Sequence, residues 1–216
     1  MKSASVTYTF VDICWTLFYS NTTFDFLDFC VQDEAYLRLR RRFKRPFFRY
    51  MNLLLYKAFR YDTLRIKAVA FLRGKTRSEL QQLAEAFYKS RLEPNKIEPV
   101  WQLLPDKDIV IASGTLDVIA DTVARRLPVR EVYASCLEYD KNDVCTGRFR
   151  DFLLDKDRLA GNYGNYTIFT DNLTDAALVR NARHAYIVTY GNRRRWERQL
   201  PQETPTTYIH ADRQRY

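Results

Sequence analysis

Long apolar runs are absent from this sequence of 216 residues. No stretch approaches the roughly 18 consecutive apolar residues that a membrane-spanning helix needs. The richest apolar stretch, residues 51–56, is short and contains Asn52. Residues 5–11 alternate as a strand does and lack the apolar centre of a signal peptide, so we do not expect export.

Clusters of metal-binding side chains are absent as well. The four cysteines show no CxxC spacing and no grouping with the two histidines; they are Cys14, Cys30, Cys136 and Cys145. We therefore expect reduced thiols in a cytoplasmic protein. The sequence also has no internal repeat and no low-complexity tract. Its 46% hydrophobic and 28% charged residues exclude a disordered chain, a collagen and a coiled coil.

Positive charge is in excess and is unevenly spread. Lys and Arg number 35 against 26 Asp and Glu, a formal charge of +9. Residues 36–77 hold 14 basic residues and one acid, Asp62, so this segment carries +13 and the rest of the chain −4. Aromatic residues alternate with the basic ones there. The segment indicates either a surface for an anionic partner or a solvated basic helix face whose aromatic residues turn to the core.

Apolar runs typical of strands recur along the chain and are separated by helical patterns. The runs are residues 6–11, 108–112, 131–134, 166–170 and 186–190. Residues 116–124 and 176–182 place apolar side chains at helical spacing. This alternation predicts an α/β fold, a doubly wound parallel sheet with helices on both faces.

The long segment after the first predicted strand has a helical character. Residues 24–91 contain no convincing strand, and their best helix covers residues 78–91, with Thr76 or Ser78 as its N-cap. A helical cap domain inserted after the first strand is therefore expected. The predicted domains are a core of residues 1–22 and 95–216 and a cap of residues 23–94.

Two smaller features complete the predicted organisation. A polar turn at residues 140–143, followed by Gly147, predicts a small hairpin. Residues 204–216 are expected to form a loose tail.

Polar residues stand where three of the predicted strands end. Asp12 ends the first strand, Ser113-Gly114-Thr115 follows the second and opens a helix, and Asp171 follows the fourth. Ligands of open parallel sheets bind beyond the carboxyl ends of the strands. A hydroxyl and free N–H groups at a helix start suit a phosphate, and two carboxylates suit Mg²⁺. Each residue alone is typical of a helix cap or a turn, whereas the three together favour a site.

Four motifs occur in order along the chain. They are Asp12-Ile13-Cys14-Trp15-Thr16-Leu17, Ser113 after its strand, Lys156 after Thr146-Gly147, and Thr170-Asp171-Asn172-Leu173-Thr174-Asp175. With a helical segment between the first two motifs, residues 5–192 resemble the haloacid dehalogenase superfamily, in its phosphoserine-phosphatase-like branch with a helical cap. The resemblance implies a Rossmann-like core of the haloacid-dehalogenase type.

The resemblance also implies roles in catalysis. Asp12 would be the nucleophile that forms an aspartyl-phosphate. Ser113 would donate to a phosphoryl oxygen, and Lys156 would neutralise charge in the transition state. The substrate contacts would be Cys14, Gly114 and Thr115.

The implied cofactor is Mg²⁺. It would bind Asp12, the backbone carbonyl of Cys14 and Asp171, and would screen the repulsion between carboxylate and phosphate. Asp175 would orient the water shell of the metal or Lys156. The alternative for Lys156 is a surface lysine at a helix start, because lysines are mostly exposed.

The sequence departs from the family pattern around two of these residues. Cys14 stands where the family has an Asp that protonates the leaving group and then activates water, and a thiol is a poor replacement. Trp15 stands in place of a Gly, which adds bulk beside Asp12. Thr170 and Asn172 replace the Gly and Ser around the fourth-motif carboxylate.

Two functions from different classes follow. The first is a Mg²⁺-dependent phosphohydrolase or phosphotransferase that acts through an aspartyl-phosphate on Asp12. Its substrate would be a lipid-linked or other anionic phosphate, and Cys14 would weaken its general acid catalysis. The alternative is a non-catalytic haloacid dehalogenase-like protein that binds a phosphorylated ligand or a protein partner. Retention of Asp12, Ser113, Lys156, Asp171 and Asp175 together favours the enzyme.

The basic segment, residues 36–77, predicts a preference for anionic surfaces. Basic and aromatic residues interleave there, and Leu53-Leu54-Leu55 could enter a lipid interface. The segment is also similar to the caps of superfamily enzymes that act on lipid phosphates. We expect a cytoplasmic protein with peripheral contact to the inner face of the membrane. Nucleic acid is the weaker expectation, because no recognised nucleic-acid motif is present.

Overall fold

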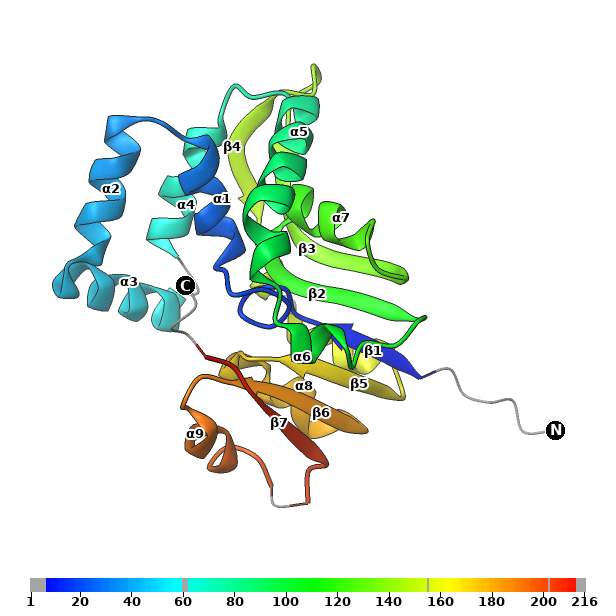
Figure 1. The fold of residues 1–216 in the computed structure, drawn as a ribbon. Coiled ribbons are helices and arrows are strands. Elements are labelled where there is room, and N and C mark those ends of the chain that lie inside the picture. The colour runs from blue at the N-terminus through cyan, green and yellow to red at the C-terminus, as the bar shows by residue number, and fades with distance from the viewer. Residues whose placement is uncertain (1–6, 60–61, 155, 202, 213–216) are drawn as a thin grey trace.

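The centre of the computed structural model, which describes residues 7–59, 62–154, 156–201 and 203–212, is a seven-stranded sheet (Figure 1). The strands are β1 Tyr8–Val11, β2 Ile109–Leu116, β3 Val129–Tyr139, β4 Cys145–Arg150, β5 Tyr166–Thr170, β6 His184–Thr189 and β7 Thr206–His210. Their order in the sheet is β4-β3-β2-β1-β5-β6-β7. Neighbouring strands are parallel, except that β3 and β4 are antiparallel.

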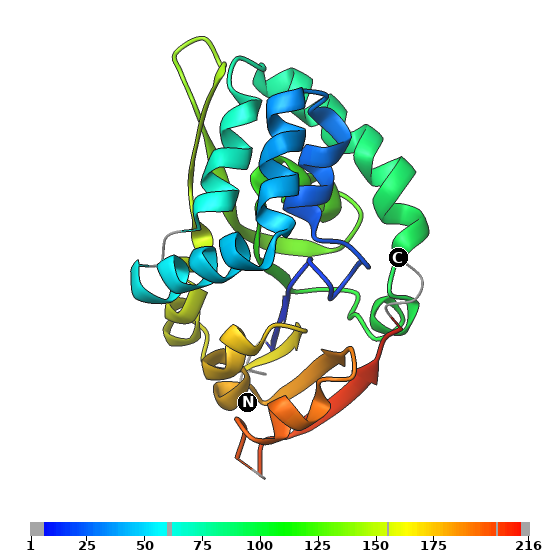
Figure 2. The ribbon, with the colours of Figure 1, turned by 90° about the vertical axis from the view of Figure 1, so that its left-hand side faces the viewer.

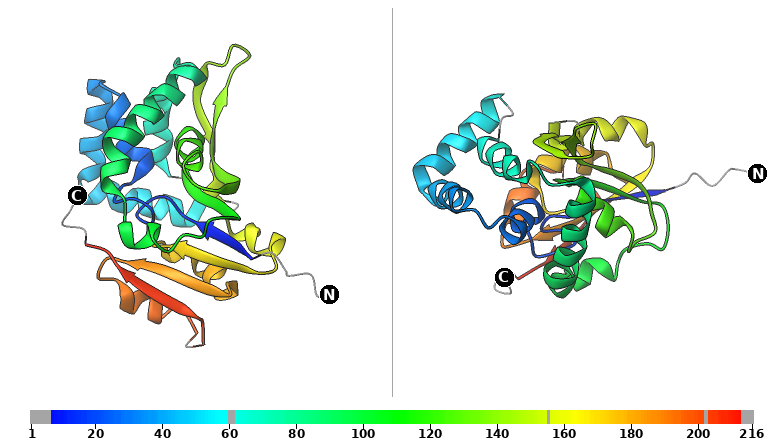
Figure 3. Two further views of the ribbon diagram at one scale, coloured as in Figure 1. Left: turned by 45° about the vertical axis from the view of Figure 1, so that its right-hand side comes forward. Right: turned by 90° about the horizontal axis from the view of Figure 1, so that it is seen from above.

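Helices lie on both faces of this sheet (Figures 1 and 3). They are α1 Thr22–Cys30, α2 Glu34–Lys44, α3 Pro46–Phe59, α4 Thr63–Val69, α5 Arg77–Phe87, α6 Glu98–Trp101, α7 Asp117–Ala124, α8 Ala176–Asn181 and α9 Arg193–Glu197. Shorter 3₁₀ and π segments are η1 Ala70–Leu72, η2 Tyr88–Leu92, η3 Glu93–Asn95, η4 Phe152–Leu154, η5 Lys156–Asn162 and η6 Leu173–Asp175. Among the described residues, no helix combines the length and apolarity needed to cross a membrane.

The strand β1 shows why the sheet needs both helical layers. Successive side chains of a strand point to opposite faces. Val11 is buried in an apolar cluster with α1, α5 and α7, whereas Phe10 is buried in a second cluster with α8 and α9. A parallel sheet buried on both faces has nearly continuous apolar strands. The predicted doubly wound α/β fold is confirmed.

The described residues between β1 and β2 form helices, as expected. Figure 2 shows α1, α2 and α4 side by side, with α3 running across their ends. The predicted helix of residues 78–91 is present as α5 and the π-turn η2, and Thr76 is its N-cap, since its Oγ1 accepts from the Glu79 N–H at 3.1 Å. The division into a core of residues 1–22 and 95–216 and a cap of residues 23–94 stays a prediction.

The second strand is longer than predicted. β2 continues to Leu116, so Ser113, Gly114 and Thr115 lie within the strand, and α7 begins only at Asp117. The expectation that these three residues open a helix is therefore wrong. The pairing of β2 with β3 becomes irregular between Ala112 and Leu116. An irregularity of this kind lets the backbone stay extended while the strand changes direction.

The expectation of a loose C-terminal tail is wrong for its described part. β7 pairs in parallel with β6 along its whole length, from Ala185 opposite Thr206 to Thr189 opposite His210. Ile209 is buried in the cluster on the α1 side of the sheet. Ile209 is the one side chain of β7 that is buried, so the strand shows no alternation of apolar and polar residues that the sequence could reveal. Residues 213–216 lie outside the described residues, as does residue 6 of the first predicted strand.

The predicted hairpin is confirmed in β3 and β4. Asp140 Oδ1 accepts hydrogen bonds from the N–H groups of Asn142 and Val144, at 2.9 and 3.0 Å, and so closes the turn. Gly147 has a φ of +76°, and a Cβ there would lie 3.0 Å from the carbonyl oxygen of Ala70. Glycine is needed at this position because it tolerates both the left-handed backbone and the close approach.

Candidate active site

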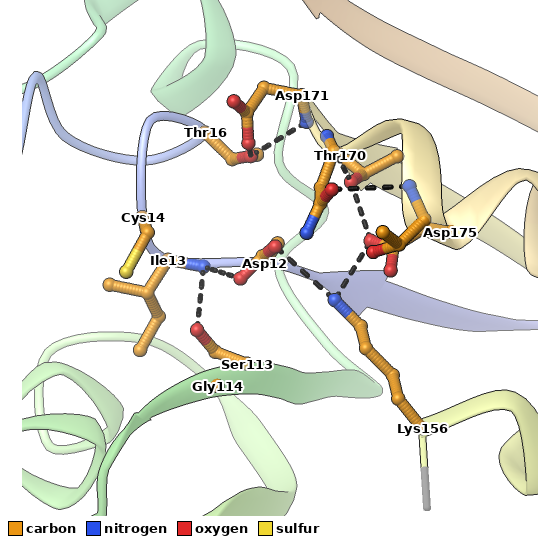
Figure 4. A network of polar contacts seen from close by, with 12 residues as sticks. Asp12, Ile13, Cys14, Thr16, Ser113, Gly114, Lys156, Thr170, Asp171 and Asp175 are labelled. Atoms are coloured by element: carbon orange, nitrogen blue, oxygen red, sulfur yellow. Dashed lines mark hydrogen bonds and ion pairs between the residues drawn. The ribbon is translucent and has the colours of Figure 1, made fainter. Parts of the chain in front are cut away.

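Asp12 stands at the carboxyl end of β1, in the middle of the sheet. Its side chain is 6% exposed. The backbone N–H of Ile13 donates to Asp12 Oδ1 at 2.8 Å and to Ser113 Oγ at 3.4 Å (Figure 4). One backbone group thus connects Asp12 to Ser113 on the neighbouring strand.

Lys156 approaches the same carboxylate from η5. Its ammonium Nζ donates to Asp12 Oδ2 at 3.2 Å and to Asp175 Oδ2 at 2.8 Å, and Thr170 Oγ1 donates to Asp175 Oδ2 at 2.6 Å (Figure 4). Burial alone would lower the pKa of Lys156, but the charges of Asp12 and Asp175 and the hydrogen bonds to both raise it. The lysine is only 4% exposed and is fully charged at neutral pH.

Asp171 follows β5 on the other side of Asp12. Its backbone N–H donates to Thr16 Oγ1 at 3.0 Å, and Thr16 Oγ1 lies 3.4 Å from Asp171 Oδ1. Burial, and then the negative charges of Asp12 and Asp175, raise the pKa of Asp171 to about 8. Asp171 therefore keeps its proton at neutral pH unless a positive charge joins the site.

This charge balance fits a bound cation. Across the described part of the chain, no three His, Cys, Asp or Glu side chains form a ready metal cluster. Mg²⁺ does not need one, because it usually takes one or two carboxylates and completes its shell with water and phosphate oxygens. Asp12 and Asp171 line the same cavity and suit this pattern, with the backbone carbonyl of Cys14 as a candidate third ligand.

A cavity of about 310 Å³ opens in front of these carboxylates. Its lining comes from the strand ends and from the helical segment, and consists of Asp12, Cys14, Trp15, Asn21, Thr23, Phe24, Asp62, Arg65, Gly114, Leu153, Asp171 and Asn172. Of the expected substrate contacts, Cys14 and Gly114 are in this lining. Ser113 and Thr115 are fully buried behind it.

Thr115 belongs instead to a buried hydrogen-bonded chain that ends at Cys14. The sulfur of Cys14 lies 2.9 Å from Thr22 Oγ1, which lies 2.6 Å from Thr115 Oγ1. Burial, and then the charge of Asp12, raise the pKa of the Cys14 thiol to about 11. Cys14 is therefore a protonated thiol at neutral pH, and Thr115 acts on the site only through Thr22.

Residues 10–195 match the family model of the haloacid dehalogenase-like hydrolases. The chain belongs to that family. The resemblance drawn from the four motifs is thereby confirmed. No curated protein matches this haloacid dehalogenase-like chain.

Solved structures share the fold of this haloacid dehalogenase-like protein. A protein of unknown function from Bordetella pertussis Tohama I has a TM-score of 0.67 at 14% identity, over 94% of this chain and 98% of its own. A phosphoserine phosphohydrolase-like protein from Francisella tularensis subsp. tularensis SCHU S4 has a TM-score of 0.61 at 15% identity, over 94% and 95% of the two chains. A probable phosphoserine phosphatase from Vibrio cholerae has 0.56 at 14%, over 94% and 60%. At these identities the likeness concerns the fold.

Trp15 keeps the backbone shape that a glycine would adopt easily. Its φ is +54°, in the left-handed region that costs a bulky residue about 1 kcal/mol or more. Tyr190 holds it there, since the tyrosine hydroxyl donates to the Trp15 carbonyl at 2.6 Å and the two rings meet edge to face at 5.7 Å. Trp15 thus adds an aromatic side chain to the cavity wall on a backbone conformation that favours glycine.

Arg65 was not singled out from the sequence, where it is one basic residue among many. The structure buries it to 4% exposure at the cavity wall. Its guanidinium donates to Asp151 Oδ1 at 2.7 Å, to Ser135 Oγ at 2.8 Å and to the carbonyl of Gly114. These three partners lie 49 to 86 positions away in the chain, so no local pattern indicates this arginine.

Proposed function

We propose that this chain is a Mg²⁺-dependent phosphohydrolase or phosphotransferase whose nucleophile is Asp12. The observation that carries the proposal is the double anchoring of Asp12 at a cavity wall. One oxygen accepts from a backbone N–H and the other from the buried ammonium of Lys156. Such fixed geometry favours attack on a bound phosphate over free rotation of the carboxylate.

In the proposed reaction an oxygen of Asp12 attacks phosphorus. The bond from phosphorus to the leaving oxygen breaks, that oxygen keeps the electron pair, and an aspartyl-phosphate remains. Lys156 neutralises negative charge on the phosphoryl group. Ser113, buried behind the cavity lining, keeps the Ile13 N–H in place beside Asp12. Water then cleaves the acyl-phosphate bond, or another acceptor takes the phosphoryl group. Bound Mg²⁺ would supply screening of the repulsion between carboxylate and phosphate.

Cys14 determines which leaving groups suit this reaction. An alkoxide must be protonated as it departs, and a thiol hydrogen-bonded to Thr22 is poorly matched to that task. Aryl or acyl phosphates leave as weaker bases and need less help. We therefore expect such phosphate esters to be the better substrates.

The cavity wall suggests the rest of the substrate. Trp15, Phe24 and Leu153 present apolar surface beside the carboxylates, and the ion pair of Arg65 with Asp151 closes the wall. This lining favours a small phosphorylated molecule, or a lipid-linked phosphate, with an apolar group next to the phosphate. Residues 23–94 would act as the cap that contributes Phe24 and Arg65. A cytoplasmic location is part of the same proposal.

The test is hydrolysis of p-nitrophenyl phosphate with and without Mg²⁺. Wild type should be active only with Mg²⁺, and Asp12→Asn should be inactive while its thermal unfolding remains cooperative. Activity that survives in Asp12→Asn would contradict the assignment of the nucleophile. Activity that is independent of added Mg²⁺ after chelation would contradict the role of the metal.

A second candidate is a non-catalytic protein that binds a phosphorylated ligand through the same residues. The observation in its favour is Cys14, which occupies the acid position as a protonated thiol. Calorimetric titration with inorganic phosphate in the presence of Mg²⁺ separates the two functions. Binding of phosphate without turnover, in wild type and in Cys14→Asp alike, would favour this second function.

A further inference from the structure

The helix α3 turns an apolar stripe toward solvent. Phe47, Tyr50, Met51 and Leu54 follow the spacing that places side chains on one face of a helix. They are 67%, 60%, 40% and 41% exposed. A surface helix normally turns such a stripe to the core, so this face is available to something outside the chain.

The opposite face of α3 fixes this orientation. Asn52 donates from Nδ2 to Asp62 Oδ1 at 3.0 Å and accepts from the Leu64 N–H at 3.1 Å, which ties α3 to the start of α4. Phe48 and Leu55 lie half-buried on the same inner side. The amide side chain of Asn52 thus points inward, and the stripe points outward.

Positive charge surrounds the stripe. Residues 34–59 contain eight basic residues and one acid, Glu34, which lies at the far end of α2 and pairs with Arg38 at 3.3 Å. Four exposed basic residues stand where α2 meets α3; they are Arg41, Arg42, Lys44 and Arg45. An apolar face beside a basic corner suits an anionic surface that also has an apolar layer.

The position of the corner allows contact with an extended surface. In Figures 1 and 3 the junction of α2 and α3 lies at the outer edge of the molecule, away from the sheet. Apart from the catalytic cavity, a crevice of about 190 Å³ opens beside the stripe; it is lined mainly by apolar residues together with Arg42 and Lys67. None of the four stripe residues lines the catalytic cavity.

We infer that α3 and the α2–α3 corner form a docking surface for an anionic lipid bilayer. The stripe enters the boundary between headgroups and acyl chains, and the basic corner contacts the headgroup phosphates. A second copy of this chain is the poorer partner, because its corner would bring positive charge against positive charge. Of residues 53–55, which the sequence suggested for insertion, Leu55 is half-buried on the inner side, whereas Leu54 belongs to the exposed stripe.

Vesicle co-sedimentation of the full chain tests the inference. The protein should bind vesicles of phosphatidylcholine with phosphatidylglycerol more strongly than vesicles of phosphatidylcholine alone, and rising salt should weaken the binding. Arg41→Ala and Arg45→Ala should each lower the partition coefficient roughly fivefold. Phe47→Ser with Met51→Ser should lower it further. Matched controls are Leu103→Ser and Arg194→Ala, which change an exposed apolar and an exposed basic residue elsewhere.

Three outcomes would overturn the inference. They are absence from both kinds of vesicle, equal binding to both, and loss of binding in the control variants to the same degree. A dimer in light scattering that Phe47→Ser abolishes, together with no vesicle binding, would assign the stripe to a second copy. The Asp12→Asn variant should still bind vesicles, so failure of the catalytic proposal and failure of this inference are distinguishable.

Discussion

Cys14 occupies the position at which the family pattern has a general acid, but a thiol in this setting cannot serve as one. Its sulfur is hydrogen-bonded to Thr22 at the cavity wall. The thiol is protonated at neutral pH, because burial and then the charge of Asp12 raise its pKa to about 11. General acids and bases work best when their pKa lies near the working pH. The thiol is therefore too weak an acid to help an alkoxide leave quickly, and too rarely ionised to activate water.

Replacement of Cys14 by Asp should restore this missing step. A positioned acid contributes about 10²- to 10⁴-fold, so Cys14→Asp should raise Mg²⁺-dependent turnover of an alkyl phosphate by that order and of an aryl phosphate by less. Cys14→Ser is the matched control, since it keeps a hydrogen-bonding group beside Thr22 without the acid. If Ser and Asp raise turnover equally, the gain comes from relief of packing beside Trp15.

Lys156 supports stability as well as the proposed chemistry. Lys156→Met leaves Asp12 and Asp175 buried without their shared cation. Breaking a buried ion pair costs about 3–5 kcal/mol. Urea unfolding should show a loss of this order near neutral pH and a smaller one in acid, where a carboxylate of the variant takes up a proton. Lys75→Met is the control, because its pair with Glu79 is exposed and should contribute under about 1 kcal/mol. Equal losses in both variants would contradict the buried pairing.

At the scale of elements, the segment expected to be a loose tail contains β7, an edge strand of the sheet. Ile209→Ala should destabilise the fold by about 2–4 kcal/mol, because it removes a side chain that is 7% exposed in the core. Thr207→Ala, on the exposed side of the same strand, should cost much less. The two are compared by chemical denaturation. A free energy of unfolding unchanged by Ile209→Ala would mean that β7 is not docked in solution.

The free energy of unfolding should depend on pH through Asp117, the first residue of α7. Asp117 Oδ1 accepts from the Val118 N–H and Oδ2 from the Leu137 N–H of β3, yet burial raises its pKa from 3.8 to about 6. The folded state therefore binds a proton more tightly than the unfolded state, and the stability due to that proton is lost as the pH rises through about 6.

Denaturation of wild type and Asp117→Asn measures this loss. From about pH 5 to about pH 7, the free energy of unfolding of wild type should fall relative to that of the variant. Asp106→Asn, in an exposed bend, is the control and should follow wild type. A constant difference between wild type and Asp117→Asn over this range would contradict the raised pKa.

At the scale of the whole molecule, Arg65 ties the helical segment to the sheet. It reaches from α4 to Gly114 on β2, Ser135 on β3 and Asp151 beyond β4. Arg65→Met should therefore speed hydrogen exchange of the α4 amides more than that of β6, whereas Arg148→Met, which breaks an exposed pair with Glu138, should speed neither. Uniform acceleration of all elements would mean that Arg65 supports only global stability.

The sequence predicts the layers of this molecule better than its edges. Continuous apolar runs such as β5 mark buried parallel strands wherever they occur, so the doubly wound sheet could be predicted. β7 could not, because one buried side chain leaves little pattern. Motif spacing predicted the meeting of Asp12 with Asp171, since both end central strands. The contacts of Arg65 and Thr115 depend on partners far away in the chain, which local patterns do not encode.

The central place of β1 has a consequence for the order in which this protein is made. Thr9 of β1 pairs with Ile109 of β2, and Tyr8 of β1 pairs with Tyr166 of β5. During synthesis β1 therefore leaves the ribosome long before either of its partner strands has been made. Closing such long loops is slow, and an unpaired apolar strand is prone to join other chains meanwhile. Asp12 can reach its final setting only after β5 docks. Recovery of activity during refolding should therefore lag behind formation of the helices, and nascent chains that stop before residue 166 are expected to depend most on chaperones.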